Sequence, residues 1–415
     1  MPVFSPYSIA HVQVLEAVHF SPPAGNAFLV FWWQKIPLGH LWIQEENPLT
    51  QAAFRTAVVA AITPAAMYYF SKAHSNQWQE AFELGNAKLL QEQLQESAAI
   101  QTFSKPHSTE RLSVVICTRN RTAALKQCID ALQKSIDTAF ELVIVDNAPD
   151  NDSTEKLVQQ YSGVRYVQEP RKGLDIARNT GVAQASGDLI AFTDDDVLVE
   201  EAWTENVKKA FANEQTACVT GLVLPAELKT KWQYHFEKYL GFNRGYVPLV
   251  FDKMFFSKHK ESGVPVWEIG AGANMAFRKS IFQQVGVFDE RLDVGAAGCS
   301  GDSELWYRAL AEGYTCRYFP QLYVQHQHRE TEKELRNQVF HYMRGHVASL
   351  LVQYERYGHK GNLKRLYRKL PKWYWTRFRN KVRGRNSPAF ETLFTEIRGC
   401  ISGWRFYQKH KPKKG

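Results

Sequence analysis

Three consecutive aspartates, Asp194, Asp195 and Asp196, are the residues of this chain best suited to chemistry. They follow an apolar run at 189–192, so the stretch 187–196 predicts a buried strand that ends in concentrated negative charge. Adjacent carboxylates repel one another unless a cation compensates, and their oxygens suit hard divalent ions such as Mg²⁺ or Mn²⁺. The stretch therefore indicates either a metal site at a strand end or a solvated acidic turn.

The chain around this stretch alternates between strands and helices. Apolar runs predict strands and amphipathic stretches predict helices between them, in the order 112–117 (strand), 122–134 (helix), 142–145 (strand), 153–161 (helix), 164–167 (strand) and 174–185 (helix). Such alternation implies right-handed βαβ units and a mainly parallel sheet covered on both faces. We expect an α/β domain over 109–330, with ligands at the carboxyl ends of its strands.

Polar side chains at those strand ends belong to one predicted crevice. Thr118 and Arg119 follow the first strand, Asp146 follows the second, and the aspartate triplet follows the strand at 189–192. A dinucleotide-binding fold needs a Gly-rich turn after its first strand, and residues 117–121, CTRNR, contain no glycine. NAD and FAD are therefore not expected.

The second half of this domain offers further site candidates. The aromatic- and Lys-rich stretch 225–265 predicts either a lid or acceptor-binding loop, or a helix packed on the domain edge. Small residues within 268–278 permit close approach of the backbone to a ligand. Asp302 opens a predicted helix, where it serves either as a catalytic carboxylate or as an N-cap.

Residues 1–108 predict a separate, small α+β domain. Apolar runs at 28–33 and 40–43 bracket the turn-prone residues 37–39, which favours a β-hairpin or two short strands. Two helices are expected at 52–71 and 77–97, and a linker at 102–110. The region contains no catalytic constellation.

Composition indicates a globular protein of more than one domain. The chain has 415 residues, 44% of them hydrophobic, and its six cysteines are widely spaced without a CxxC pair. No basic n-region with an apolar core opens the chain, and its most apolar window, 56–70, is too short to span a bilayer. These features favour a cytoplasmic location.

Positive charge is concentrated in the C-terminal region, 331–415, which we expect to be helical. Residues 360–385 contain eleven Lys and Arg and no acidic residue, interleaved with Trp373, Trp375 and Phe378. This composition is typical of an interfacial segment that meets anionic lipid. A nucleic acid is also an anionic surface that could bind this segment, but it is not the expected partner. The alternative to an interfacial segment is a basic helix that is simply solvated.

Taken together, the motifs resemble family 2 of the glycosyltransferases, inverting nucleotide-sugar enzymes with a GT-A fold. About 220 residues carry the resemblance, in the family's order, through the segments 114–119 (VVICTR), 145–147 (VDN), 173–181 (GLDIARNTG), 187–196 (GDLIAFTDDD), 272–276 (GANMA), 286–290 (GVFDE), 301–308 (GDSELWYR) and a strand that ends at His326. Any single motif is weakly specific, whereas the ordered set is specific.

The resemblance implies roles for matching positions. Thr118 and Asp146 match residues that hold the base and ribose of the donor nucleotide, with Arg119 beside them, and Arg178 and Asn179 match positions near the diphosphate. Asp194, Asp195 and Asp196 match the Asp-x-Asp element, in which Asp194 and Asp195 contact the donor and Asp194 and Asp196 bind Mg²⁺ or Mn²⁺. Asp302 matches the catalytic base, and His326 or His328 a position that completes the metal shell.

Two departures from the family's pattern bear on function. The family usually has Glu-Asp where this chain has Gly301 and Asp302, so either Glu304 compensates or acceptor binding differs. Polymerising members carry membrane-spanning helices and a Gln-x-x-Arg-Trp motif. Residues 353–357, QYERY, match this motif only in part. We therefore expect transfer of a single sugar.

These observations predict a metal-dependent glycosyltransferase that moves a sugar from a nucleotide-sugar donor to a surface polysaccharide or lipid-linked glycan, at the inner face of the cell membrane. A non-catalytic sugar-nucleotide or glycan-binding module would explain the same motifs if Asp302 is only an N-cap. A nucleotidyltransferase shares the sheet topology but would be expected to have a Gly-rich phosphate loop.

Overall fold

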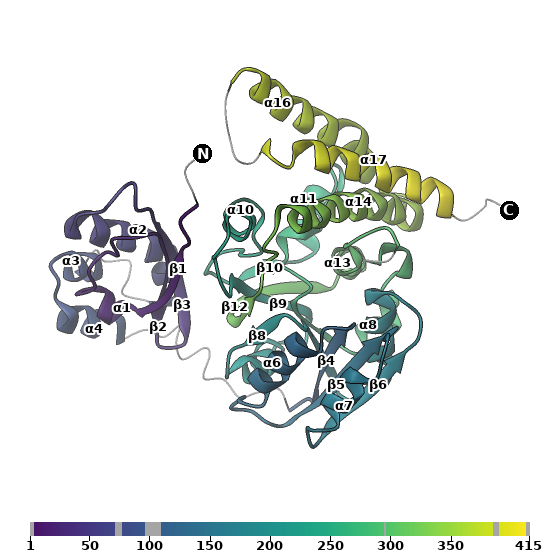
Figure 1. The fold of residues 1–415 in the computed structure, drawn as a ribbon, viewed down its shortest axis with the longest axis horizontal. Coiled ribbons are helices and arrows are strands. Elements are labelled where there is room, and N and C mark those ends of the chain that lie inside the picture. The colour runs from purple at the N-terminus through teal and green to yellow at the C-terminus, as the bar shows by residue number, and fades with distance from the viewer. Residues whose placement is uncertain (1–3, 71–76, 96–108, 294–295, 385–389, 412–415) are drawn as a thin grey trace.

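The computed structural model describes residues 4–70, 77–95, 109–293, 296–384 and 390–411. An N-terminal sheet with its helices stands at the left of a central α/β unit, and long C-terminal helices lie across the top of that unit (Figure 1). The expected linker at 102–110 falls almost wholly outside the described residues.

The N-terminal region is built on a three-stranded sheet in the order β1-β2-β3. Its strands are β1 (Ser8–Gln13), β2 (Ala27–Trp33) and β3 (Ile36–Ile43), and its helices are α1 (Val14–Ala17), α2 (Gln51–Tyr69), α3 (Gln77–Glu83) and α4 (Ala87–Gln95). β2 and β3 form an antiparallel hairpin, as predicted, whereas β1 pairs in parallel with β2. The parallel strand β1 was not expected.

The hairpin turn lies at Gln34 and Lys35, so its predicted position at 37–39 is wrong. Gln34 has a positive φ of 53°, which lets two residues reverse the chain. Pro37 is accommodated inside β3 because this is an edge strand and its partner Trp32 lies at a register shift. The predicted helix at 77–97 is likewise divided, since α3 ends before Gly85, which has a φ of 75°.

The central unit contains a nine-stranded sheet in the order β10-β12-β9-β11-β7-β4-β5-β6, with β8 paired to β12. The strands are β4 (Leu112–Thr118), β5 (Phe140–Asn147), β6 (Val164–Glu169), β7 (Leu189–Asp194), β8 (Val197–Val199), β9 (Thr216–Pro225), β10 (Leu249–Phe251), β11 (Asn274–Arg278) and β12 (Thr315–His326). β4, β5, β6, β7, β9 and β12 run in one direction, whereas β8, β10 and β11 run in the other. The predicted α/β class with a mostly parallel sheet is confirmed.

Helices cover both faces of this sheet. They are α6 (Thr122–Leu132), α7 (Ser153–Val158), α8 (Leu174–Gln184), α9 (Trp203–Ala210), α10 (Lys231–Leu240), α11 (Lys253–Lys260), α12 (Ile281–Val285) and α13 (Gly301–Ala311), with short 3-10 turns at Val266–Glu268 and Glu290–Leu292. β4 lies between the two cores, because Val115 packs into one hydrophobic cluster and its neighbours Val114 and Ile116 into the other. The aromatic stretch 225–265 thus forms two helices and an edge strand.

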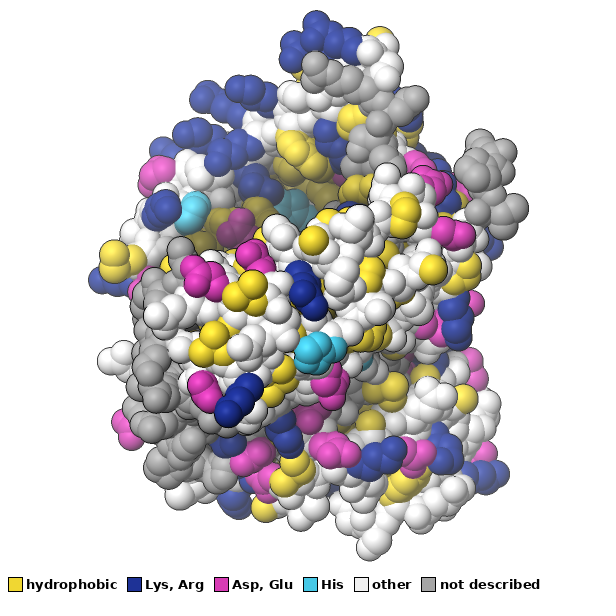
Figure 2. All heavy atoms as spheres, turned by 90° about the vertical axis from the view of Figure 1, so that its left-hand side faces the viewer, with side chains coloured by type: hydrophobic (Ala, Val, Ile, Leu, Met, Phe, Trp, Pro, Cys, Tyr) yellow, Lys and Arg dark blue, Asp and Glu magenta, His cyan; other side chains and the backbone are white. Residues whose placement is uncertain are grey.

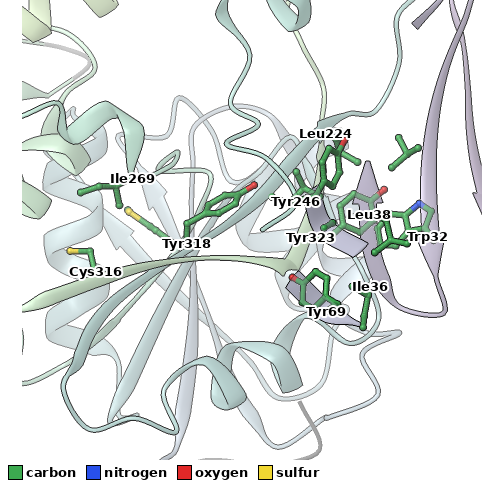
Figure 3. Close-up of a cluster of buried hydrophobic side chains, with 14 of the residues drawn as sticks. Trp32, Ile36, Leu38, Tyr69, Leu224, Tyr246, Ile269, Cys316, Tyr318 and Tyr323 are labelled. Carbon is green, nitrogen blue, oxygen red and sulfur yellow. The ribbon is translucent and has the colours of Figure 1, made fainter. Parts of the chain in front are cut away.

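The N-terminal sheet is joined to the large sheet by a buried aromatic cluster, shown in Figure 3. Trp32 packs edge-on against Tyr323 of β12, with ring centroids 5.0 Å apart. Tyr69 of α2 accepts a 2.7 Å hydrogen bond from the Gln321 side-chain amide. Polar and apolar contacts therefore fix the N-terminal region on the central unit.

The C-terminal region is helical, as expected. It comprises α14 (Glu332–Tyr357), α15 (Lys360–Lys364), a π-helical turn (Arg365–Lys369), α16 (Leu370–Val382) and α17 (Leu393–His410). The π-turn ends two residues before Pro371, which has no N–H to continue the regular bond pattern. α17 approaches α14 closely because Gly399 and Gly403 carry no side chain against its backbone carbonyls.

None of the helices in the described ranges combines the length and the apolarity that a bilayer-spanning segment needs.

Candidate active site

A cleft of about 2300 Å³ opens along the carboxyl ends of β4 and β7. Thr118, the aspartate triplet and Asp302 line its central part, and side chains of α14 and α16 extend it on one side. His40 and Trp42 of the N-terminal sheet also contribute to its wall. The cleft is thus built by all three parts of the chain.

Asp195 faces the end of β4. Its carboxylate accepts hydrogen bonds from Thr118 Oγ1 at 2.8 Å and from Arg121 Nη1 at 2.5 Å. Burial raises the pKa of Asp195 to about 7, although Arg121 and Thr118 act in the opposite direction. Sequence reasoning missed Arg121; its place three residues after Thr118, the last residue of β4, was the available signal.

Asp194, Asp196 and His326 form a group whose potential ligand atoms all lie within 4.8 Å of one another. These are the three residues that the sequence predicts as metal ligands. Two carboxylate oxygens and an imidazole nitrogen are a donor set that suits Mn²⁺, and the oxygens also suit Mg²⁺. The residues present therefore fit a divalent ion.

His326 is held in a form that can donate a lone pair. Its Nε2 lies 3.6 Å from Asp196, and burial lowers its pKa to about 4, which keeps the imidazole neutral at physiological pH. Its Nδ1 lies 3.2 Å from Nδ1 of His328, whose Nε2 contacts Glu237 at 2.9 Å. His328 is thus placed to orient His326 rather than to reach the acids itself.

Asp194 and Asp196 differ in their electrostatic surroundings. Burial raises the pKa of Asp194 to about 6, against the opposing effect of Arg178. Burial acts in the same way on Asp196, but Arg121 at 2.8 Å and Arg329 at 3.7 Å outweigh it and hold its pKa below the ordinary value. Arg121 therefore bridges Asp195 and Asp196 and neutralises part of the charge of the triplet.

Arg178 of α8 reaches into the same part of the cleft. It forms an ion pair with Asp175 at 3.1 Å and lies 3.8 Å from Asp194. Burial disfavours its charge, yet Asp175, Asp194 and Asp302 together raise its pKa. A fixed guanidinium at this point is suited to an anionic ligand.

Asp302 lies in the first turn of α13 and lines the cleft opposite Gly272. A Cβ at position 272 would lie only 2.8 Å from Asp302 Oδ2 and 3.0 Å from Arg178 Nη2, so glycine leaves room for both side chains. Asp302 Oδ1 accepts a 2.6 Å bond from the N–H of Ser303, and the helix begins with Ser300 as N-cap. Asp302 is therefore not the N-cap residue.

Asp175 is a site residue that the sequence did not reveal. Its carboxylate is buried against Gly301, at the position where a side chain of residue 301 would have to lie. Burial raises its pKa to about 7, with Arg178 opposing the shift. The family usually has a glutamate where this chain has Gly301, and here the Asp175 carboxylate of α8 occupies the space of that side chain.

Glu304 does not supply that missing acid. It is fully buried and forms a two-oxygen ion pair with Arg308, 2.7 Å at its closest. Arg308 in turn donates to the carbonyls of Val285 and Val287. The suggestion that Glu304 compensates is wrong, because this pair holds α13 against the preceding turn.

Three other predicted residues lie at different depths. Arg119 lines the cleft and donates to the Ala148 carbonyl at 3.2 Å. Asp146 is fully buried, accepts from Tyr166 Oη at 3.0 Å, and does not line the cleft. Asn179 is also outside the lining, since both ends of its amide are bonded to the backbone of Phe288.

The order of these elements can be compared with known families. A model of Glycosyl transferase family 2 matches residues 113–286. These residues form a glycosyltransferase family 2 domain. The family 2 domain supplies the cleft residues from Thr118 to Gly272, whereas Asp302 and His326 come from the chain that follows the matched part.

Curated relatives match about half of this chain. A glucosyl-dolichyl phosphate glucuronosyltransferase of Haloferax volcanii is 26% identical over 187 residues, which cover 43% of this chain and 56% of the relative. Glycosyltransferase AglE of the same organism is 25% identical over 214 residues, covering 50% of this chain and 64% of the relative. The chain thus spans less than two thirds of the length of either relative.

One solved structure is also similar. A mannosyltransferase from Pyrobaculum calidifontis, in complex with GDP-Man and Mn²⁺, aligns with 74% of this chain and 92% of its own at 13% sequence identity, with a TM-score of 0.47.

Proposed function

We propose that this protein is an inverting glycosyltransferase that moves one sugar from a nucleotide-sugar donor to a hydroxyl group of an acceptor. The observation that carries the proposal is that the cleft built around the family 2 domain holds the group Asp194, Asp196 and His326 together with the separate carboxylate of Asp302. The reaction needs both parts, because charge develops on the leaving diphosphate while the attacking hydroxyl loses its proton.

The donor occupies the end of the cleft at β4 and β7. Thr118 and Arg119 lie at the end of β4, where they contact the nucleoside, and Arg178 faces the diphosphate. Asp195 holds Thr118 through their hydrogen bond and so fixes one edge of this subsite. Asp146 acts from beneath, at the position of β5 that pairs with Thr118.

Asp194, Asp196 and His326 hold Mg²⁺ or Mn²⁺. When bound, the ion supplies Lewis-acid stabilisation of the leaving diphosphate. Arg178 adds a second positive charge within 3.8 Å of Asp194, so the chain itself also stabilises negative charge at this point.

Asp302 serves as the general base. Its carboxylate faces the cleft across Gly272, close to but separate from the acid triplet. It accepts the proton of the attacking hydroxyl as the new glycosidic bond forms and the bond to the diphosphate breaks on the opposite face of the sugar. One displacement of this kind inverts the anomeric configuration.

The acceptor is a surface polysaccharide or a lipid-linked glycan, reached from the inner face of the cell membrane. Support comes from one relative, the glucosyl-dolichyl phosphate glucuronosyltransferase, and from the outer surface of α16. There Trp375, Phe378 and Val382 are exposed among basic side chains. Figure 2 shows Lys and Arg side chains gathered over the C-terminal helices at the top of the molecule.

A donor screen tests the proposal. Thermal unfolding is measured with a panel of nucleotide sugars, each with Mn²⁺, with Mg²⁺ and with a chelator, because a ligand that binds only the folded state raises its stability. We expect one nucleotide class to stabilise the protein only when the ion is present, and to be slowly hydrolysed. Equal stability with every donor would contradict the proposal, and stabilisation without any turnover would favour a binding module.

A further inference from the structure

The cleft continues beyond Asp302 along a wall that the family 2 domain does not provide. Tyr342 and His346 of α14 follow the loop that carries Cys299 and Ser300, and Gly345 lets that loop approach α14. Beyond them the lining passes to the continuous helix of α15, the π-turn and α16. The wall and Asp302 line one continuous cleft.

Three cations and a tryptophan lie along that wall. Arg365, Lys369, Lys372, Trp373 and Thr376 all line the cleft, at spacings that place them on one face of the helix. The π-turn spans Arg365–Lys369, so its geometry sets the positions of Arg365 and Lys369 around the helix axis. The wall is thus a stripe rather than scattered surface charge.

Arg365 is held in place by neighbouring rings. Its guanidinium stacks 3.9 Å from the centre of the Trp267 ring, and its Nε donates to His346 Nε2 at 3.1 Å. His346 is a neutral acceptor, since burial and Arg365 lower its pKa to about 3. Arg244 completes the group by donating to the carbonyl of Trp267 at 3.1 Å.

These positive charges form no close ion pair, although Glu268, which lines the same cleft, acts on Arg244 and Arg365 from a distance. Within the described ranges no salt bridge joins Arg244, Arg365, Lys369 or Lys372 to a carboxylate, and the nearby Glu268 is solvent-exposed. Burial lowers the pKa of Arg365 to about 10, and burial together with Arg365 and Lys364 lowers that of Lys369. A lowered pKa means that the charged form of each side chain is disfavoured where it stands, so a bound anion would stabilise both cations.

We propose that this wall binds a phosphate or diphosphate group of the acceptor, with Arg365, Lys369 and Lys372 as its ligands and Trp267 and Trp373 flanking it. The inference rests on the proposed transferase function and names its acceptor class: a molecule that carries both the reacting hydroxyl and a phosphate. Two sources share that chemistry, a lipid-linked phosphate and a soluble sugar phosphate.

Binding is measured by calorimetry on the full chain, without donor or metal, using decyl phosphate, inorganic phosphate and decanol. We expect decyl phosphate to bind and decanol not to bind at the same concentration. Binding of decyl phosphate alone assigns the site to a lipid-linked phosphate, and comparable binding of inorganic phosphate assigns it to a soluble one.

The variant K369Q/K372Q should weaken phosphate binding at least tenfold, and R365Q should do so independently. Both lysines are exposed, so their replacement leaves the fold intact. Arg368→Gln is the matched control, because Arg368 lies in the same π-turn but does not line the cleft, and it should retain the wild-type Kd within twofold.

The proposal is overturned if neither phosphate binds at millimolar concentration, if decanol binds as well as decyl phosphate, or if K369Q/K372Q and R365Q both leave the Kd unchanged. These outcomes are independent of the donor screen. If no donor binds in the presence of metal but phosphate does bind, the transferase function is overturned. If a donor binds in the presence of metal but phosphate does not bind, only the phosphate site is overturned.

Discussion

Gly301 has no space for a side chain because the buried carboxylate of Asp175 lies where its Cβ would be. Gly301→Ala should therefore push α13, and Asp302 with it, away from the cleft. Overpacking of this kind costs about 1–3 kcal/mol of stability, and turnover should fall more than donor affinity. Denaturant unfolding and steady-state kinetics measure the two effects.

A double-mutant cycle identifies the cause. Asp175→Ala removes the overlapping carboxylate, so the stability cost of Gly301→Ala should be smaller in that background. Additive costs would mean that the two residues do not compete for one space.

The Asp175 carboxyl also predicts a pH dependence of stability. Its pKa is about 7 in the folded protein, above its ordinary value, so the folded state retains a proton that the unfolded state releases near pH 4. Its contribution is complete at low pH and is lost as the pH rises through 7. Asp175→Asn should reduce the downward slope of unfolding free energy between pH 5 and 7 by at most about 1.4 kcal/mol per pH unit.

Denaturant titrations of the metal-free protein across this pH range provide the measurement. Asn retains an acceptor for Arg178, so the variant removes the titration with little change in packing. An unchanged slope would assign the pH dependence to Asp194 and Asp195, whose pKa values burial also raises.

Asp302→Asn should lower sugar transfer by roughly two to four decades, the usual size of a general-base effect, while donor binding persists. The amide keeps the shape of the side chain but cannot accept the proton. Asp188→Asn serves as the control, because Asp188 lies at the opposite end of β7 and is half exposed. Transfer near the wild-type rate in Asp302→Asn would remove Asp302 from the mechanism.

The two histidines should affect metal affinity to different degrees. His326→Ala removes a proposed ligand and should abolish tight Mn²⁺ binding. His328→Gln only releases the orientation of His326 and should weaken binding about 10- to 100-fold, as is common for partners of metal ligands. Calorimetric Mn²⁺ titration measures both, and an unchanged Kd in His326→Ala would exclude this histidine as a ligand.

The outer face of α16 should govern attachment to anionic lipid. Trp375 is 63% exposed and Val382 is 70% exposed, with Phe378 between them. Trp375→Ala/Phe378→Ala should reduce co-sedimentation with anionic vesicles at least tenfold, and added salt should weaken the remaining binding. Tyr68→Ala is the control, since Tyr68 is 51% exposed on the N-terminal region. If both variants sediment with the vesicles to the same extent, the outer face of α16 is not the site of lipid attachment.

Local patterns were sufficient to predict the strands that carry the acids. The runs before Thr118 and Asp194 are apolar and short, which is typical of buried parallel strands. Because such strands end at one edge, Thr118, Arg119 and the aspartate triplet could be expected around one crevice, and all of them line it, whereas the equally expected Asp146 does not. Arg178 and Asp302, which the family resemblance implied, lie on helices and also line the cleft.

Contacts between distant segments could not be predicted in the same way. Nothing local to Asp175 indicates that it packs against Gly301, and nothing in α14 or α16 shows that they extend the cleft. The antiparallel insertion of β11 between β7 and β9 is likewise a long-range pairing. These features depend on tertiary packing, which a single sequence does not encode in its periodicity.

Helix α16 carries Lys372 and Trp373 of the proposed phosphate-binding wall, and it also carries the exposed Trp375 and Phe378. A helix with its side chains is about 10–12 Å across, so a protein attached through the outer side would hold its cleft about one helix diameter above the lipid. The acceptor would then be found by diffusion in two dimensions, whereas the donor arrives from solution. Turnover would follow the surface density of acceptor in the bilayer rather than its bulk concentration.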